Sequence, residues 1–193
     1  VSTMRRFVIV ATPRSGSNRL CKLLNSHPVV LCHHELFNPA GIFTALPLRD
    51  DPHFDLGSRS ARDADPAAFL EQVWERNLGH DWLGFKITDP QQPALRKHLC
   101  QDATIHKIVL RRRSALKAYL SRLVAEHTGR WEDYRTKRLA TSPKKVHVDY
   151  AHLRGAVVTL RSAPTRSTSG SASFQAPTVP PRSRPAGRLI STR

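Results

Sequence analysis

A short polar loop, TPRSGSN at residues 12–18, carries residue types that suit an anion. Gly16 allows a positive φ, so the backbone amides around it can point toward one centre. Four of its side chains add donors or positive charge: Arg14, Ser15, Ser17 and Asn18. A helix that follows the loop would aim its free N–H groups and its dipole at the same centre. The loop is a candidate anion site, and an ordinary strand-to-helix turn is the alternative.

The loop differs from the phosphate-binding loop of ATP- and GTP-hydrolysing proteins, G-x-x-x-x-G-K-[ST]. When the two are aligned on Gly16, Ala11 takes the first glycine position. Ser17 takes the lysine position, and Asn18 takes that of the Mg²⁺-binding hydroxyl. Because both groups are missing, we expect the loop to bind its anion without Mg²⁺–ATP.

A second basic segment has the sequence VLRRRSALKAYLS and ends at Ser121. Arg113, Lys117 and Ser121 are spaced i, i+4 and i+8, so they share one stripe of a helix. Four apolar side chains form the neighbouring face: Leu116, Leu120, Leu123 and Val124. The stripe could bind a second phosphate, or the arginine run could simply be solvated. Two anion sites in one α/β sheet would suit a nucleotide with phosphates at both ends.

The elements that must position these residues follow from hydrophobic spacing. Four short apolar runs predict buried strands: Arg6–Ala11, Val29–Cys32, Trp82–Thr88 and Ile105–Leu110. Three segments predict helices: one that stops at Asn25–Pro28, then Pro66–Asn77 and Ser114–His127. Residues 38–65 predict a long loop with short helices. The alternation predicts an α/β fold with a mostly parallel sheet flanked by helices.

The chain has 193 residues and a net charge of +16, which favours an anionic partner. Nucleic acid, a membrane surface and a phosphorylated small molecule all fit this charge. Residues 1–154 predict one α/β domain. Residues 155–193 form a basic Ser/Pro/Arg-rich tail without Asp or Glu, so we expect disorder there. The tail could be an arm that binds nucleic acid or a membrane surface, or a non-native segment produced by a reading-frame shift.

Three cysteines without a C-x-x-C pair predict reduced, buried thiols and a cytoplasmic protein. No apolar run reaches the length of a membrane span, and the first residues lack a secretory apolar region. His33 and His34 would face opposite ways in a strand, so we expect no metal site there. The three tryptophans are interpreted as core residues, and Lys86 as a plain lysine near a strand end.

Several motifs together resemble the sulfotransferase family, most closely bacterial carbohydrate sulfotransferases of the nodulation-factor and sulfolipid type. TPRSGSNRL resembles their 5′-phosphosulfate loop, and RRRSALKAYLS resembles their 3′-phosphate motif, with Arg113 and Ser121 at the matching spacing. HELFN, WLGFKIT and LVAEHTGRW also resemble family segments. The resemblance covers about residues 5–153 and implies a sulfotransferase fold similar to that of the P-loop proteins.

The resemblance implies a sulfuryl transfer from 3′-phosphoadenosine 5′-phosphosulfate to a hydroxyl of a carbohydrate or glycolipid, without a metal. Glu35 would be the catalytic base, with a raised pKa, and His34 is the alternative base. Arg14 would stabilise charge on the bridging oxygen of the donor. Arg14, Ser15, Gly16, Ser17, Asn18, Arg113 and Ser121 would bind the nucleotide.

The resemblance stops near VHVDYAHLRG, where family members usually continue with further helices. We therefore expect the domain to be incomplete at its C-terminus. The alternatives to an active sulfotransferase are a truncated, inactive relative that binds the nucleotide only in part, and a basic nucleic-acid-binding protein. No recognised nucleic-acid motif supports the last of these.

Overall fold

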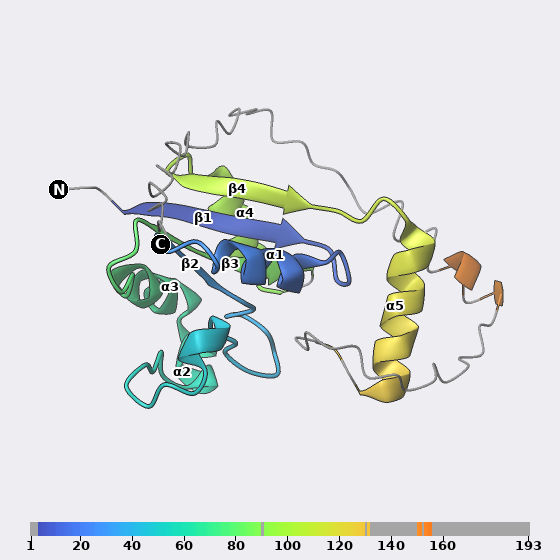
Figure 1. Ribbon diagram of the computed structural model, residues 1–193, viewed down its shortest axis with the longest axis horizontal. Helices are drawn as coiled ribbons and strands as arrows, with labels where there is room; N and C mark the ends of the chain where they lie inside the picture. Colours follow the sequence, from blue (N-terminus) through green and yellow to red (C-terminus); the bar gives the residue numbers. More distant parts are fainter. Residues whose placement is uncertain (1–3, 90, 130, 132–149, 152, 156–193) are drawn as a thin grey trace, which may run out of the picture.

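The fold is an α/β arrangement around one parallel sheet, seen in a computed structural model that describes residues 4–89, 91–129, 131, 150–151 and 153–155. The sheet has four strands in the order β2-β3-β1-β4. Their bounds are β1 Arg5–Ala11, β2 Val30–His33, β3 Trp82–Thr88 and β4 Ile105–Leu110. All three strand pairs are parallel, so the carboxyl ends of the strands meet at one edge (Figure 1). The expected parallel α/β sheet is confirmed.

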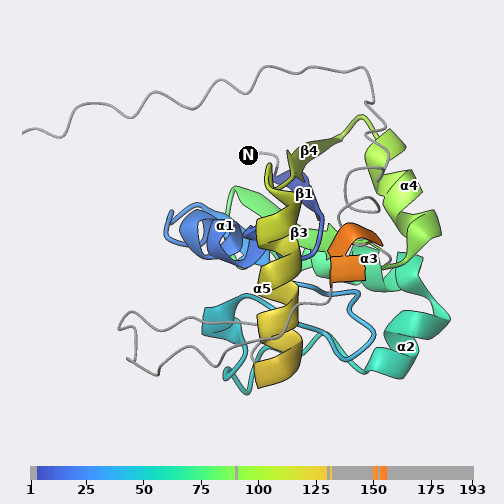
Figure 2. The ribbon, with the colours of Figure 1, turned by 90° about the vertical axis from the view of Figure 1, so that its right-hand side faces the viewer.

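Helices cover both faces of the sheet. Their bounds are α1 Ser17–Leu24, α2 Arg59–Ala64, α3 Pro66–Glu75, α4 Pro93–Gln101 and α5 Ala115–Thr128, with a 3₁₀ turn η1 at Leu46–Leu48. In Figure 2, α1 lies on one side of the strands, and α3 and α4 lie on the other. Alternate residues of β1 supply the two cores, since Phe7 and Ile9 pack with Cys21 of α1 while Val8 packs with Val73 of α3. The period of two along the strand separates the faces.

Most predicted elements are present, with small differences at their ends. β2 is shifted by one residue toward the C-terminus, and α3 ends two residues earlier than predicted. The long 38–65 loop does carry two short helical pieces, η1 and α2. Helix α4 was not predicted. It has only two buried apolar residues, Leu95 and Leu99, so its hydrophobic pattern is weak.

The face that α5 turns to the protein differs from the prediction. Leu116, Leu120 and Val124 are exposed. The buried residues of α5 are Ala118, Tyr119 and Ala125. Ser121 lies in the same helical stripe as Ala118 and Ala125 and accepts a hydrogen bond from Arg14 of the loop before α1. The predicted apolar face was therefore wrong.

Strand β2 forms one edge of the sheet, and a side chain covers part of that edge. Asn25, the C-terminal cap of α1, donates from Nδ2 to the Cys32 carbonyl over 2.7 Å and accepts from the Cys32 amide at Oδ1 over 2.7 Å. The side-chain amide thus pairs with β2 as a neighbouring strand would. It ties the end of α1 to the strand that leads to Glu35.

The predictions for the cysteines and the tryptophans are confirmed only in part. Cys21 and Cys32 are buried free thiols, and Cys100 is half-buried. The interpretation of the tryptophans as core residues is confirmed for Trp74, and Trp82 is partly buried against the core, but it is wrong for Trp131, which is exposed. Of the predicted tail, residues 155–193, only Gly155 is among the described residues, so its expected disorder lies outside them. In the described part of the chain, no helix is both long and apolar enough to cross a bilayer.

Candidate functional site

The polar loop joins the end of β1 to the start of α1, as its sequence predicts. Gly16 has a φ of 95° and precedes the first turn of α1 without a side-chain cap, so Gly16 places no side chain over the helix amides. The Ser15 amide donates to the Thr12 carbonyl over 3.2 Å and closes the turn, so it does not point to an anion as predicted. The Ser15 hydroxyl is buried and has no hydrogen-bond partner among the described residues. A buried donor beside uncapped helix amides fits an anion in this loop.

Glu35 lies two residues beyond β2, at the carboxyl edge of the sheet. Three donors converge on its carboxylate. Lys86 Nζ lies 2.8 Å from Oε1. Asn38 Nδ2 and Gln91 Nε2 donate to Oε2 over 2.6 and 2.7 Å. The carboxylate is thus fixed in orientation and only partly reachable by solvent.

Lys86 is the centre of the arrangement. It lies in β3, its side chain is 2% exposed, and Gly84 two residues before it allows the close approach of Phe7. Its Nζ pairs with Glu35, lies 3.5 Å from Ser17 Oγ and contacts Asn18 Oδ1. One ammonium group therefore connects the anion loop to the carboxylate. Its interpretation as a plain lysine near a strand end was wrong.

The environment of Glu35 lowers its pKa from the ordinary value. Burial by itself raises the pKa. The charge of Lys86 and the hydrogen bonds from Lys86, Asn38 and Gln91 together outweigh that burial. Glu35 is consequently a carboxylate at neutral pH, and the raised pKa expected from the sequence was wrong.

The loop also contacts α5, which stands across the carboxyl end of the sheet (Figure 1). Arg14 has a φ of 63°, and its Nε donates to Ser121 Oγ over 3.0 Å. A second nitrogen of Arg14 donates to the Trp131 carbonyl over 2.5 Å. The structure thus brings together Arg14 and Ser121, which the sequence had placed in two separate anion sites.

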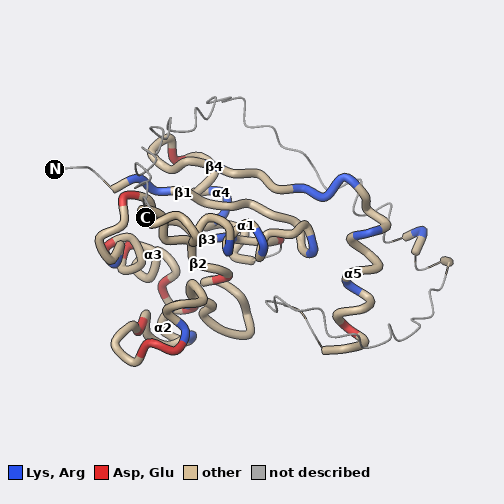
Figure 3. The backbone as a smooth tube through the Cα atoms, viewed as in Figure 1, with Lys and Arg blue, Asp and Glu red and all other residues tan. Residues whose placement is uncertain are grey.

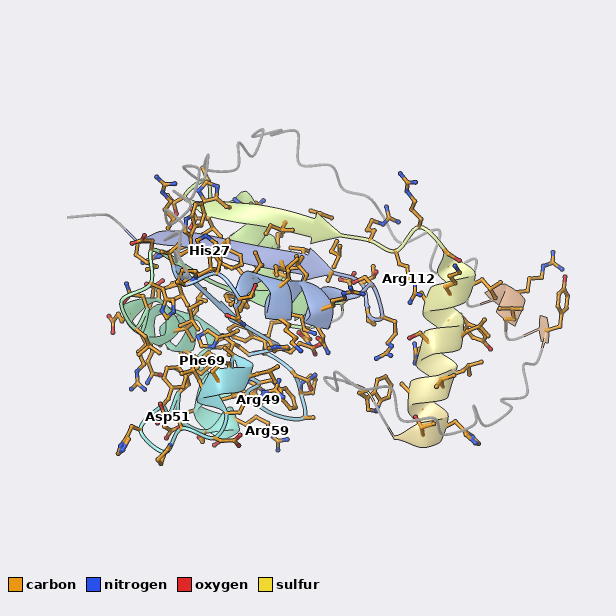
Figure 4. All side chains as sticks on the ribbon, viewed as in Figure 1. His27, Arg49, Asp51, Arg59, Phe69 and Arg112 are labelled. Carbon is orange, nitrogen blue, oxygen red and sulfur yellow. The ribbon has the colours of Figure 1, made fainter. Side chains whose placement is uncertain are left out.

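Further arginines surround this contact. Arg112 donates to the Arg14 carbonyl over 3.2 Å and lies between the end of β1 and α5 (Figure 4). Partial burial, and then the charge of Arg112, lower the pKa of Arg14. Figure 3 shows the basic stretch Arg111–Arg113 on the connection between β4 and α5. Arg113 is exposed there, and the structure brings it into no hydrogen bond or ion pair with the described residues.

The histidines before Glu35 are fully buried. His33 Nδ1 accepts from the Ala45 amide over 3.1 Å, and the ring stacks on Phe54. Burial, with smaller contributions from His34 and His80, lowers the pKa of His33 to about 4, so this ring is neutral. Among the described residues, no group of three or more His, Cys, Asp or Glu side chains could hold a metal ion.

Sequence reasoning missed three members of the site: Lys86, Asn38 and Gln91. The Gly-x-Lys of β3 was noted, and register alone could have placed Lys86 beside Ile9 at the centre of the sheet. Asn38 and Gln91 lie in loops that carry no periodic signal. Only tertiary structure brings them within hydrogen-bond distance of Glu35.

Comparisons with known proteins find similarity to nodulation protein H. Nodulation protein H of Rhizobium tropici is 30% identical over 129 residues, which cover 65% of this chain and 48% of the relative. Nodulation protein H of Rhizobium meliloti (strain 1021) is 29% identical over 140 residues, which cover 71% of this chain and 54% of the relative. These two similarities support a relationship to the sulfotransferases. It spans about half the length of these relatives. No protein-family model and no solved structure matches it.

Proposed function

We propose that this protein transfers a sulfuryl group from 3′-phosphoadenosine 5′-phosphosulfate to a hydroxyl of a carbohydrate or glycolipid, on a P-loop-like sulfotransferase fold. The relationship to nodulation protein H supports the reaction class. One structural observation carries the proposal: Lys86 connects the carboxylate of Glu35 with Ser17 and Asn18 of the anion loop. The side chain of Lys86 thus contacts both the candidate base and the anion loop.

The loop would hold the 5′-phosphosulfate through the amides of the first turn of α1 and the buried Ser15 hydroxyl. The position of lysine in a nucleotide-triphosphate loop is Ser17 here, and Lys86 reaches the same place from β3. Lys86 would supply the positive charge that the loop sequence lacks. Charge that develops next to the 5′-phosphate is then stabilised without a metal ion.

Glu35 would accept the proton of the acceptor hydroxyl. The hydroxyl oxygen forms a bond to sulfur, the bond from sulfur to the bridging oxygen breaks, and adenosine 3′,5′-bisphosphate leaves with that electron pair. Sulfuryl transfer has a loose transition state by analogy with phosphoryl transfer, so the hydroxyl loses its proton late. A carboxylate of low pKa serves this role, since the proton becomes acidic as sulfur is transferred.

Arg14 and Ser121 would bind the 3′-phosphate end or the bridging oxygen, depending on how Arg14 turns. Arg14 is already within hydrogen-bond distance of Ser121, and its long side chain is anchored only by exposed or half-buried groups. Arg113 lies on the adjacent connection and adds charge to the same side. Tight closure around the nucleotide requires these side chains to give up their present partners.

Nucleotide binding is the first test. Adenosine 3′,5′-bisphosphate at about 100 times its Kd should raise Tm by about 5–10 °C, while ATP with Mg²⁺ should raise it much less. Arg14→Ala should reduce the shift, and Arg19→Ala, an exposed arginine in α1, is the matched control. An equal shift with ATP and Mg²⁺, or none with the bisphosphate, would contradict the proposed donor.

Transfer is the second test, with radiolabelled donor and carbohydrate acceptors. Glu35→Gln should lower kcat by about 10²–10⁴ and leave the bisphosphate shift intact, because a neutral amide cannot take the proton. Glu71→Gln, an exposed residue of α3, is the control for loss of an acidic group. Full activity of Glu35→Gln would remove Glu35 from the role of base.

A further inference from the structure

We propose that Gln91 is a positioning residue for catalysis, which together with Asn38 occupies Oε2 of Glu35 and leaves Oε1 as the atom that takes the acceptor's proton. This inference rests on the proposed sulfuryl transfer. It assigns a role to two amide side chains from loops that sequence reasoning had not singled out.

Gln91 is held from both ends. Its side chain is buried, and its Oε1 accepts from the Thr88 amide over 3.2 Å. The backbone N–H of Gln91 donates to the Thr88 carbonyl over 2.7 Å. The bond from the Thr88 amide to Oε1 fixes which end of the side-chain amide faces Glu35, so Nε2 points to the carboxylate. Gln91 cannot turn without leaving the Thr88 amide unpaired.

Asn38 is fixed in a similar way. Its Oδ1 accepts from the Ala40 amide over 2.8 Å, so its Nδ2 faces Glu35. Behind it, the fully buried Arg62 donates to the carbonyls of Leu36, Asn38 and Gly41 over 2.8–3.0 Å. The loop that carries Asn38 is therefore anchored to α2. Both side-chain amides that donate to Glu35 are therefore held in place by hydrogen bonds to the backbone.

The two oxygens of Glu35 are consequently unequal. A carboxylate oxygen has two acceptor positions in the plane of the group. Oε2 accepts from Asn38 and Gln91, so both of its positions are used. Oε1 accepts from Lys86, whose Nζ also lies 3.5 Å from Ser17 Oγ of the anion loop. An acceptor hydroxyl that approaches the donor sulfur would meet Oε1.

Few titratable groups face this carboxylate. Lys86 of β3 is the cation in contact with it. The charge of Glu35 also acts on the Cys21 thiol of α1. The neutral ring of His33 lies in β2, two residues before Glu35. Gln91 is uncharged, so its replacement changes the pKa of Glu35 through one hydrogen bond rather than through net charge. A variant that adds a carboxylate here should act in the same direction and more strongly.

The test is a ¹³C NMR titration of the Glu35 carboxyl, assigned by comparison with Glu35→Gln. Gln91→Met keeps the length of the side chain and removes the donor, so the pKa of Glu35 should rise by about one pH unit. Gln91→Glu keeps the acceptor for Thr88 and places two carboxylates together, so the rise should be larger. Gln101→Glu, an exposed residue at the end of α4, adds the same charge elsewhere and should leave the pKa unchanged.

Activity gives the second readout. The acid limb of the pH profile of kcat/KM should move to higher pH in both variants, and further in Gln91→Glu than in Gln91→Met. At neutral pH, kcat should fall about tenfold while KM for the donor stays constant. A Glu35 titration that is unchanged in both variants overturns the positioning role, even if activity falls. A fall in donor affinity of similar size would also contradict it.

The two proposals fail in different ways. If no acceptor is sulfated and no bisphosphate binds, the proposed function is wrong, but the NMR titration still tests the clamp on Glu35. If transfer occurs and the titration does not respond to Gln91, only the positioning role is wrong. Tm of each variant, measured first, shows whether it is folded.

Discussion

The two sides of the candidate site are held in different ways. On one side, the carboxylate of Glu35 is bound by Lys86, Asn38 and Gln91, and the partners are themselves anchored in β3 and in tight loops. On the other side, Arg14 reaches across to Ser121 of α5 and to the Trp131 carbonyl, beside an exposed arginine run. The first assembly is buried and its bonds support one another. The second depends on one long side chain.

This contrast indicates which half of the site is formed before a ligand arrives. Buried, charge-assisted hydrogen bonds that share partners are strong and rigid. Exposed contacts of a long cation contribute little to stability and exchange readily with water or an anion. We therefore expect the base and its cation to be preorganised, and the nucleotide to order the Arg14 side. Substitutions on the two sides should therefore differ in their effects on stability and on binding.

Lys86→Met should have the largest effect. The variant leaves the Glu35 carboxylate, 20% exposed, without its cation, so the free energy of unfolding at pH 7 should fall by about 2–4 kcal/mol. In the wild type the pKa of Glu35 is lowered, so its contribution is present above the unfolded pKa of about 4.3 and is lost as pH falls through the folded pKa. Without Lys86, only the hydrogen bonds from Asn38 and Gln91 oppose the effect of burial, so the pKa of Glu35 should be higher than in the wild type.

Urea unfolding of Lys86→Met should therefore approach that of the wild type as pH falls from 7 toward about 4. Lys22→Met, an exposed lysine of α1, is the control for removal of a charge and should change stability little at either pH. A difference between Lys86→Met and wild type that is equal at both pH values would mean that Lys86 stabilises by packing rather than by pairing with Glu35.

Gly16→Ala and Gly129→Ala should cost about the same stability, about 1–2 kcal/mol each. Both glycines have positive φ values, 95° and 67°, and open space where a Cβ would lie, so backbone strain is the whole cost. Only Gly16→Ala should also weaken bisphosphate binding, because Gly16 shapes the anion loop. Loss of binding in both variants would show that α5 is as important to the cradle as the loop itself. Thermal shifts with and without ligand make the comparison.

Ser121→Ala should have a smaller effect on the unliganded protein, about 0.5–1 kcal/mol, since it removes one half-buried hydrogen bond from Arg14. Its effect on bisphosphate affinity should exceed its effect on stability, if the nucleotide orders this side of the site. Isothermal titration and urea unfolding of the same preparation separate the two. Equal effects would argue that Ser121 only holds α5 in place.

Leu120→Lys should change stability least, within about 0.5 kcal/mol, because Leu120 is on the exposed face of α5. Leu99→Ala, at a fully buried position of α4, is the matched comparison and should cost about 2–5 kcal/mol. A large loss from Leu120→Lys in urea unfolding would reveal that the exposed leucines of α5 pack against something in solution.

The fold could be predicted from local patterns where burial is periodic. The apolar runs of the strands and the polar loop before α1 carry strong signals, since a buried parallel strand and a tight turn each restrict the residue types they accept. Helix α4 has few buried residues and was missed, and the face of α5 was wrong. In α5 the leucines at 116 and 120 are exposed, while Ser121, on the side of the buried Ala118, accepts a hydrogen bond from Arg14.

The site was predictable in its residue types but not in its contacts. Arg14 and Ser121 were singled out, yet no local pattern states that they touch. The pKa of Glu35 was expected to rise with burial, and it falls because Lys86, Asn38 and Gln91 converge from separate loops and strands. Pairing of this kind depends on strand register and loop path, which one sequence encodes only through the whole fold.

The side-chain amide of Asn25 protects the open edge of the sheet at β2. It occupies the Cys32 N–H and C=O groups that an edge strand would otherwise present. An open strand edge is a template for pairing with another chain, and so for aggregation. At β2 the side chain of Asn25 already pairs with these backbone groups of Cys32, so no additional strand is needed to cover them. In a concentrated solution, the β2 edge should therefore resist pairing with the sheet of a second molecule. Asn25→Ala should make the protein more prone to form fibrils.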